Sequence, residues 1–426
     1  MDALSLAVAA NLPVILWGSP GTGKTSAVLA LGERLGLPVE VVVGSIREPS
    51  DFAGLPVLRD GRTWFAPPRW AERLASAGSG ILFLDELTTA PPAVQAAMLR
   101  VVLERTVGDL TLPPSVRIVA AANPPEQAAD GWDLSAPLAN RLIHLDWKVS
   151  AASVAEGFTG GFAAPSAPDL VLGAGEIGRA RALVGAFLRV RPELVLAVPE
   201  GAGRAWPSPR TWELAATALA CTSPTALAST SATALACTSA TVLRTGPAHA
   251  SAPSPASGAS ETDTPFGATP ARTSRTSALS GSAHASGTGV AEGGGFGVGP
   301  AEAERVRAEL VVGAVGEAAG FELLSWLRDL DLPDPETLLA DPTAPLPDRV
   351  DRVHAVLGSV VAHVTADGGA DSWQRAWTLI ARVARRTPDV AASAARSLAA
   401  RRPHGATLPS TVLDLAPILR SAGLMP

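Results

Sequence analysis

One eight-residue motif constrains this chain more than any other feature. Residues 18–25 read Gly-Ser-Pro-Gly-Thr-Gly-Lys-Thr, the complete pattern of a phosphate-binding loop, or P-loop. The apolar run at 13–17 predicts a short buried strand before it, and helical spacing over 25–35 predicts a helix after it. In this setting the glycines let backbone N–H groups curl around phosphates at the helix N-terminus. A chance glycine turn is the alternative, but it would not explain both flanking elements.

All residues of the loop are candidate nucleotide ligands, namely Gly18, Ser19, Pro20, Gly21, Thr22, Gly23, Lys24 and Thr25. Lys24 would reach the outer phosphates, and the Thr25 hydroxyl would ligate Mg²⁺. The chain holds only two lysines, Lys24 and Lys148, against 32 arginines. A compact ammonium fits between phosphate oxygens where a broad guanidinium would not, which favours a chemical reason for Lys24. We therefore predict ATP and Mg²⁺ as cofactors.

A second motif ends the apolar run at 81–84 with two adjacent carboxylates. It resembles a Walker B element, in which the first carboxylate holds the Mg²⁺ shell and the second polarises the attacking water. That resemblance implies that Asp85 is a metal partner and Glu86 the catalytic base. The alternative is a buried strand that ends in an acidic helix cap, which Thr88 and the prolines at 91–92 would also suit.

A third strand is predicted over 116–122, and Asn123 follows it directly. This segment resembles a sensor 1 strand, whose terminal asparagine helps to position the hydrolytic water. Asn123 is equally suited to form a turn before the two prolines that follow.

Two arginines complete the candidate site. Arg141 stands directly before an apolar strand and resembles an arginine finger, which a neighbouring subunit inserts to stabilise charge on a transferred phosphoryl group. The alternative is a surface arginine in a salt bridge. Arg210, in Ser-Pro-Arg at a helix start, resembles sensor 2; an arginine there opposes the helix macrodipole, which argues against a purely structural role.

Alternating strands and helices over 1–148 predict an α/β domain with a parallel sheet and flanking helices. Helical patterns at 153–158, 175–190 and from 208 predict the first part of a helical lid over 149–221. Residues 222–303 are dominated by Ala, Ser, Thr, Gly and Pro and predict a disordered insertion. An eight-residue repeat that starts at Thr217 runs into this segment and explains both cysteines, Cys221 and Cys237. The segment is either a flexible tether or a neutral insertion grown by duplication. Residues 304–426 predict a C-terminal helical domain.

The five motifs, in this order over 18–212, resemble the AAA+ superfamily. An Asp-Gly hairpin signature at 60–61 and a second predicted hairpin over 104–112 narrow the resemblance to the MoxR-like and dynein-related (AAA_5-type) group. That resemblance implies a homo-hexameric ring that hydrolyses ATP to remodel a client protein or metalloenzyme, as a chaperone would, with a von Willebrand factor A domain protein as partner. The pattern departs from the group beyond Ala220. Trp64 and Phe65 could contact a client or simply pack within the hairpin.

Composition weighs against two classes of partner. A net charge of −6 and a pI of about 5.6 provide no basic excess for nucleic acid or an anionic membrane. No apolar stretch reaches the ~18 residues of a membrane span, and the first ten residues lack a positive leader, so we expect a cytoplasmic protein. Two alternatives to the remodelling ATPase stay open: a slow nucleotide-gated regulatory switch and a nucleic-acid-associated NTPase.

Overall fold

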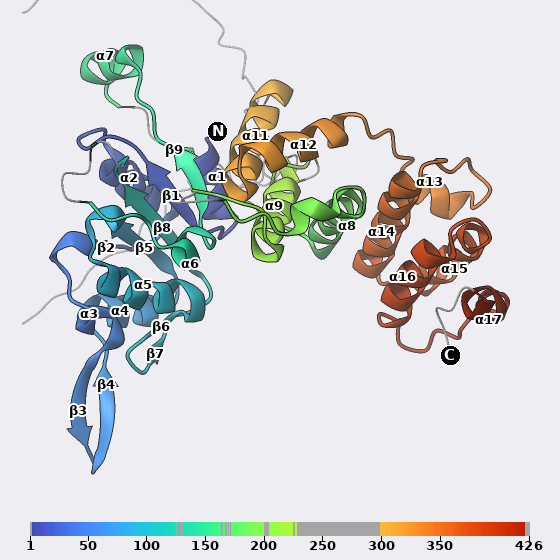
Figure 1. Ribbon diagram of the computed structural model, residues 1–426, viewed down its shortest axis with the longest axis horizontal. Coiled ribbons are helices and arrows are strands. Elements are labelled where there is room, and N and C mark those ends of the chain that lie inside the picture. The colour runs from blue at the N-terminus through green and yellow to red at the C-terminus, as the bar shows by residue number, and fades with distance from the viewer. Residues whose placement is uncertain are drawn as a thin grey trace, which may run out of the picture. The chain divides into compact units, whose positions relative to one another are not determined.

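The computed structural model describes residues 2–124, 127, 131–162, 165–166, 168, 170, 172–199, 204–224, 226–227 and 299–421. A parallel sheet with flanking helices is followed by further helices, which confirms the predicted fold class (Figure 1). Most of the predicted insertion at 222–303 lies outside the described residues. Its disorder therefore stays a prediction, as do the bounds of the four predicted domains.

The sheet has five parallel strands in the order β2-β5-β8-β1-β9. They are β1 (Val14–Trp17), β2 (Val39–Val43), β5 (Gly80–Asp85), β8 (Val116–Ala122) and β9 (Ile143–Asp146). The three strands expected from continuous apolar runs, β1, β5 and β8, are neighbours at its centre, where both faces are covered. Because the strands are parallel, the segments that follow them emerge at one edge of the sheet. The residues of the predicted site lie at this edge.

Successive side chains of each strand enter two different cores. Val14 and Leu16 of β1 belong to one core, whereas Ile15 and Trp17 belong to the other. The first core includes residues of α1 (Ala3–Ala9) and α2 (Lys24–Leu35); the second includes residues of α3 (Ser50–Ala53), α4 (Arg69–Ala77), α5 (Pro92–Glu104) and α6 (Ala136–Ala139). Helices on both faces thus hold the strand that leads into the P-loop.

Two antiparallel hairpins are separate from this sheet, as the sequence predicts. They are formed by β3 (Leu55–Arg59) with β4 (Arg62–Ala66) and by β6 (Thr106–Val107) with β7 (Leu110–Thr111). Asp60 and Gly61 join the first pair, with φ of 52° and 75°. Positive φ at both turn residues matches a type I′ turn, for which Asp-Gly is a favoured sequence.

Helices follow β9, in agreement with the helical patterns in the sequence. They are α7 (Ala151–Gly160), α8 (Ala174–Val190), α9 (Pro209–Cys221), α11 (Pro300–Val315) and α12 (Glu317–Arg328). Ser208 and Thr211 form a reciprocal capping box at the start of α9. Gly316 divides the pattern over 303–330 into two helices, because its φ of 84° suits glycine and breaks α-helical geometry.

The helices α9 and α11 pack together although residues 222–299 separate them in the sequence. Arg307 of α11 donates from Nη2 to the carbonyl oxygen of Thr222 at 2.7 Å and from Nε to the Thr222 hydroxyl at 3.2 Å. Thr222 is the residue that ends α9, so its carbonyl is one of those left without a partner inside the helix. Arg307 thereby ties the end of α9 to α11.

The remaining helices form a separate core. They are α13 (Pro335–Ala340), α14 (Val350–Asp367), α15 (Ala370–Ala384), α16 (Pro388–Ala399) and α17 (Thr411–Ser421). Small residues bring α14 against α8: a Cβ on Gly358 would lie 2.5 Å from that of Ala182, and one on Gly178 would lie 2.9 Å from that of Ala362. Among the described residues, no helix is long and apolar enough to cross a membrane.

Candidate nucleotide site

The P-loop motif at 18–25 forms a loop from Gly18 to Gly23 between β1 and α2, and its last two residues, Lys24 and Thr25, begin α2. Gly21 and Gly23 have φ of 76° and 82°, left-handed values that residues with a Cβ rarely adopt. Gly18 is required for a different reason, because a Cβ there would lie 2.7 Å from the carbonyl oxygen of Trp147. The N–H of Gly18 also donates to Ala122 at 3.2 Å, which fixes the start of the loop beside the end of β8.

Lys24 opens α2 and is almost fully buried, with 7% of its surface exposed. Its Nζ donates to the carbonyl oxygens of Gly18 and Ser19 at 2.5 and 2.9 Å and to Asn123 Oδ1 at 3.2 Å. Burial lowers the pKa of Lys24, and the negative charge of Asp85 partly opposes this. All three acceptors in contact with the ammonium are uncharged oxygens. They hold the ammonium in place, but no carboxylate contacts it to neutralise its charge. An anion would be favoured beside it.

Thr25 and the two carboxylates of the second motif meet at the same edge. Thr25 Oγ1 donates to Asp85 Oδ2 at 2.8 Å, and the Glu86 N–H donates to Asp85 Oδ1 at 2.9 Å. Asp85 is therefore held on both oxygens, with one of them next to the Thr25 hydroxyl. This pair offers the two oxygens that the sequence assigns to Mg²⁺.

Glu86 has a strained backbone and a side chain that is already engaged. Its φ is 56°, a left-handed value that is uncommon for a residue with a side chain. The Ser45 hydroxyl donates to Glu86 Oε2, and the Thr89 hydroxyl donates to the Glu86 carbonyl oxygen at 2.8 Å. Strain of this kind collects at functional sites. Ser45 follows β2, and its role was not visible in the sequence.

Asn123 lies where the sequence places it, directly after β8. Its side-chain oxygen accepts from Lys24, and its carbonyl oxygen is 3.4 Å from the Thr88 hydroxyl. Since β8 lies between β1 and β5, Asn123 stands between the P-loop and the carboxylate pair. The structure thus brings Lys24, Thr25, Asp85, Glu86 and Asn123 to one edge of the sheet.

The two arginines lie near each other rather than in this group. Burial lowers the pKa of Arg141, and the positive charge of Arg210 lowers it further. Arg141 Nη1 donates to the Pro137 carbonyl oxygen, while its Nε is buried without a hydrogen-bond partner among the described residues. Ser208, which caps the helix of Arg210, donates to Asn140 Oδ1 at 2.9 Å. In the described part of the chain, neither guanidinium bonds to the residues grouped around Lys24.

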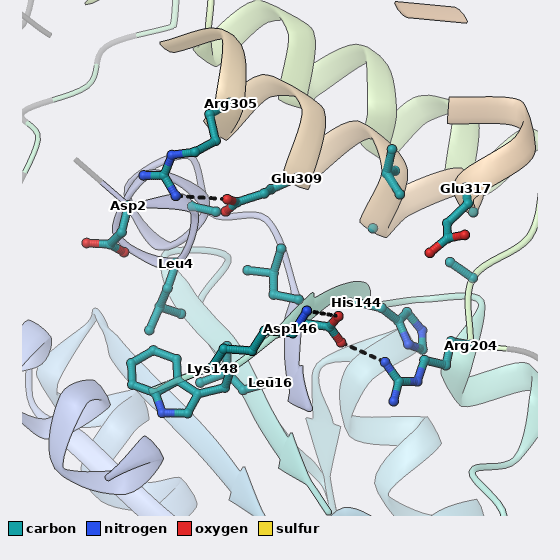
Figure 2. A pocket seen from close by; sticks show the side chains of 17 residues that line it. Asp2, Leu4, Leu16, His144, Asp146, Lys148, Arg204, Arg305, Glu309 and Glu317 are labelled. Atoms are coloured by element: carbon teal, nitrogen blue, oxygen red, sulfur yellow. Dashed lines mark hydrogen bonds and ion pairs between the residues drawn. The ribbon is translucent and has the colours of Figure 1, made fainter. Parts of the chain in front are cut away.

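A cavity of about 720 Å³ is lined by Trp147, the residue that lies against Gly18 of the loop, and by the residues around it (Figure 2). Its lining comes from the start of α1, the end of β1, β9 and the residues after it, residues 204–205, and helices α11 and α12. Each of its cationic groups pairs with a carboxylate: Arg204 with Asp146 at 2.7 Å, Lys148 with Asp146 at 3.6 Å, and Arg305 with Glu309 at 3.0 Å. The cavity therefore has polar walls but little free charge for an anion.

Comparison with known families identifies the sheet domain. A family model described as the AAA domain of the dynein-related subfamily matches residues 13–142. This segment begins just before β1 and ends just before β9, and it includes the P-loop, the carboxylate pair, Asn123 and Arg141. Residues 13–142 are an AAA domain. The prediction of a dynein-related AAA+ type is thereby confirmed, whereas nothing distinguishes the MoxR-like branch.

Curated relatives match the chain over the length of about one such domain. The C4-dicarboxylate transport transcriptional regulatory protein of Rhizobium meliloti (strain 1021) is 32% identical over 131 residues, which cover 26% of each chain. The Psp operon transcriptional activator of Escherichia coli (strain K12) is 36% identical over 119 residues, covering 26% of this chain and 37% of the activator. The chain thus spans only 26% and 37% of the length of these two relatives.

Two solved structures are also similar. A crystal structure from Cytophaga hutchinsonii, assigned as an ATPase, has 19% identity and a TM-score of 0.33, and the match covers 51% of this chain and 73% of that one. A RuvB mutant of Thermotoga maritima has 17% identity and a TM-score of 0.26, covering 50% and 54%. The assignment of the AAA domain rests on the family match and on the geometry described above.

Proposed function

We propose that the AAA domain binds ATP with Mg²⁺ and hydrolyses it. The observation that carries this proposal is the meeting of the Lys24 ammonium, the Thr25–Asp85 pair, Glu86 and Asn123 at the ends of neighbouring strands. These groups provide a cation for phosphate, oxygens for Mg²⁺, a carboxylate base and an amide that can position water. The family match to an AAA domain over the same residues supports it.

The residues present fit both cofactors. The Lys24 ammonium is buried and bonded only to uncharged oxygens, so the negative charge of a phosphate group would offset the desolvation that lowers its pKa. Mg²⁺ in nucleotide sites is held by one or two protein oxygens together with phosphates and water. Thr25 Oγ1 and Asp85 Oδ2, 2.8 Å apart, provide such oxygens. When bound, the ion would supply positive charge to the phosphate oxygens.

The cavity beside the P-loop fits the nucleoside half of ATP. Its volume of about 720 Å³ is within the usual range for small-molecule sites. Its arginine and lysine charges are paired with carboxylates, so its walls suit an uncharged polar group better than a phosphate chain. The unneutralised charge of Lys24 would take the phosphates, and the cavity would take the base and ribose.

The roles that we propose for the chain's residues follow from their positions. Lys24 holds the outer phosphates, and Thr25 and Asp85 hold the ion. Asn123 positions the attacking water, and Glu86 withdraws its proton as general base. Glu86 must first leave Ser45, since the carboxylate oxygen that accepts from the Ser45 hydroxyl is otherwise engaged. Arg141 acts on the site of a neighbouring subunit, and Arg210 on the site of its own.

The finer proposal is a MoxR-like remodelling ATPase that works as a homo-hexamer. It would act on a client protein or metalloenzyme, with a von Willebrand factor A domain protein as partner. The hairpin β3–β4 supports a client-contact role, because Leu55, Leu58 and Phe65 expose large apolar surfaces there. Trp64 is half-buried under the Arg59 guanidinium, 5.7 Å from the ring centre, which favours packing for this residue.

A second candidate function is the slow nucleotide-gated switch. The hydrogen bond from Ser45 to Glu86 favours it, because an engaged base allows ATP to stay bound without hydrolysis. The names of the curated relatives also describe regulatory proteins, but the match covers 37% or less of either one. A nucleic-acid-associated NTPase stays a third and weaker proposal, given the acidic chain.

The deciding experiment measures the ATPase rate per subunit against protein concentration, together with mass by light scattering with and without ATP. Wild type is compared with Arg141→Ala and with mixtures of the two. Arg375→Ala is the matched control, because Arg375 pairs with Asp371 on the exposed face of α15. A rate that rises with concentration, collapses in Arg141→Ala and falls in mixtures would establish shared sites in a ring. A concentration-independent rate from a monomer, unchanged in Arg141→Ala, would favour the switch.

A further inference from the structure

Trp147 is the residue where the sheet, the P-loop and the cavity meet. It directly follows β9, and its N–H donates to the Trp17 carbonyl oxygen at 2.7 Å, which extends the β1–β9 ladder by one residue. Its indole Nε1 donates to the Thr22 carbonyl oxygen at 3.0 Å. The side chain therefore reaches from the last strand to the far side of the P-loop.

The same residue also fixes the near side of the loop. Its carbonyl oxygen and Cβ lie so close to Gly18 that a Cβ on Gly18 would be 2.7 and 3.0 Å away from them. Trp147 is thus in contact with the first residue of the P-loop and hydrogen-bonded to its fifth. A loop held at both ends keeps the curve in which its N–H groups can converge on phosphates.

Trp147 lines the cavity as well, together with Leu4, Leu16 and Lys148. It is half-buried, so part of its surface is free to meet a ligand. An indole offers a flat face on which an aromatic base can stack, in a pairing that is worth more than its buried area alone. One side chain therefore borders both proposed halves of the nucleotide site.

We propose that Trp147 is a positioning residue that couples the two halves of the nucleotide site. Its indole N–H holds the P-loop at Thr22, and its ring forms a wall of the cavity that receives the nucleoside. The chain continues from Trp147 into the helices after β9, so displacement of those helices would pull on Thr22 through this one residue. This inference rests on the proposed function, because it assigns a role within the same site.

Two ligands and two substitutions separate the two parts of this role. Trp147→Phe keeps an aromatic ring and removes the donor to Thr22. It should lower the affinities for ATP and for inorganic triphosphate equally, by about threefold to tenfold, which is the usual contribution of one neutral hydrogen bond. Trp147→Ala also removes the ring that forms a wall of the cavity, so it should lower the affinity for ATP by about a further tenfold relative to the affinity for triphosphate. Both affinities are measured by titration calorimetry with Mg²⁺ present.

The matched control is Trp373→Phe. Trp373 donates from Nε1 to the Leu398 carbonyl oxygen at 3.0 Å, the same kind of bond, but inside the core of the C-terminal helices. It should lower the melting temperature without changing either affinity. If Trp147→Ala does not fold, Trp147→Leu replaces it, since leucine keeps apolar bulk without a flat ring.

The outcomes distinguish failure of this inference from failure of the proposed function. Unchanged affinities in Trp147→Phe, or equal loss of both ligands in Trp147→Ala, would overturn the role of Trp147 while ATP binding by the wild type stands. Absence of ATP binding by the wild type, or normal binding by Lys24→Ala, would overturn the nucleotide site itself and this inference with it.

Discussion

His144 makes the stability of the AAA domain depend on pH in a way that can be calculated. It lies on β9 with 8% of its surface exposed. Its Nδ1 accepts from Trp17 Nε1 at 2.9 Å, and its Nε2 lies 3.0 Å from the Ala139 carbonyl oxygen. The bond that Nδ1 accepts requires the neutral ring, because both nitrogens of a protonated ring are donors. Trp17 is the residue directly before the P-loop, so this bond supports the base of the loop.

Burial lowers the pKa of His144 to about 4, and the positive charge of Arg204 contributes in the same direction. The unfolded chain has the ordinary pKa of about 6.5 and so binds more protons than the folded chain between the two values. The contribution of neutral His144 to the free energy of unfolding is therefore present above pH 6.5 and is lost as the pH falls towards 4. The full loss is about 3 kcal/mol, of which about 2 kcal/mol is lost between pH 7 and pH 5.

The assay is urea unfolding at pH 7 and at pH 5 for wild type and His144→Gln. A glutamine provides a neutral donor and acceptor that do not titrate, so the variant should lose about 2 kcal/mol less than wild type over this interval. His404→Gln is the control, because His404 is exposed in the C-terminal region and should behave as wild type. Equal pH dependence of wild type and His144→Gln would refute the reasoning.

Three further predictions concern the base and the connection between helices. Glu86→Gln should bind ATP and barely hydrolyse it; near-normal turnover in a phosphate-release assay would remove Glu86 from the role of base. Ser45→Ala should raise the basal hydrolysis rate severalfold if the Ser45 bond restrains Glu86, and a lower rate would show instead that Ser45 supports the base. Deleting residues 225–299 should leave ATPase activity largely intact because Arg307 and Thr222 stay in place, and loss of assembly would contradict a neutral insertion.

Local patterns were enough to predict the centre of the sheet. β1, β5 and β8 are continuous apolar runs with motif residues directly after them, and parallel pairing then forces Gly18, Glu86 and Asn123 to one edge. By contrast, β2 is half-buried along most of its length, and its mixed sequence Val-Glu-Val-Val-Val lacks the continuous apolar run that predicts a central strand. The helix α17 contains Pro417, which argues against a helix when the sequence is read alone.

The residues missed in the site are those that act through tertiary contacts. Ser45 approaches Glu86 only because β2 pairs with β5, and Trp147 approaches Thr22 only because β9 pairs with β1. Neither belongs to a spaced motif. The sole hint near Trp147 was the neighbouring Lys148, one of two lysines in the chain. The positions of Ser45 and Trp147 depend on the order in which the strands pair, and short sequence motifs do not encode that order.

The tie between Arg307 and Thr222 bears on how this chain could change over evolutionary time. Thr222 lies in the first copy of the repeat, at the end of α9, and Arg307 follows the insertion, so the junction of α9 and α11 does not depend on how many later copies connect them. Gain or loss of one eight-residue copy would keep the reading frame of all that follows and leave both helices tied. Close relatives should therefore differ in copy number here while they keep an arginine and its partner at the junction.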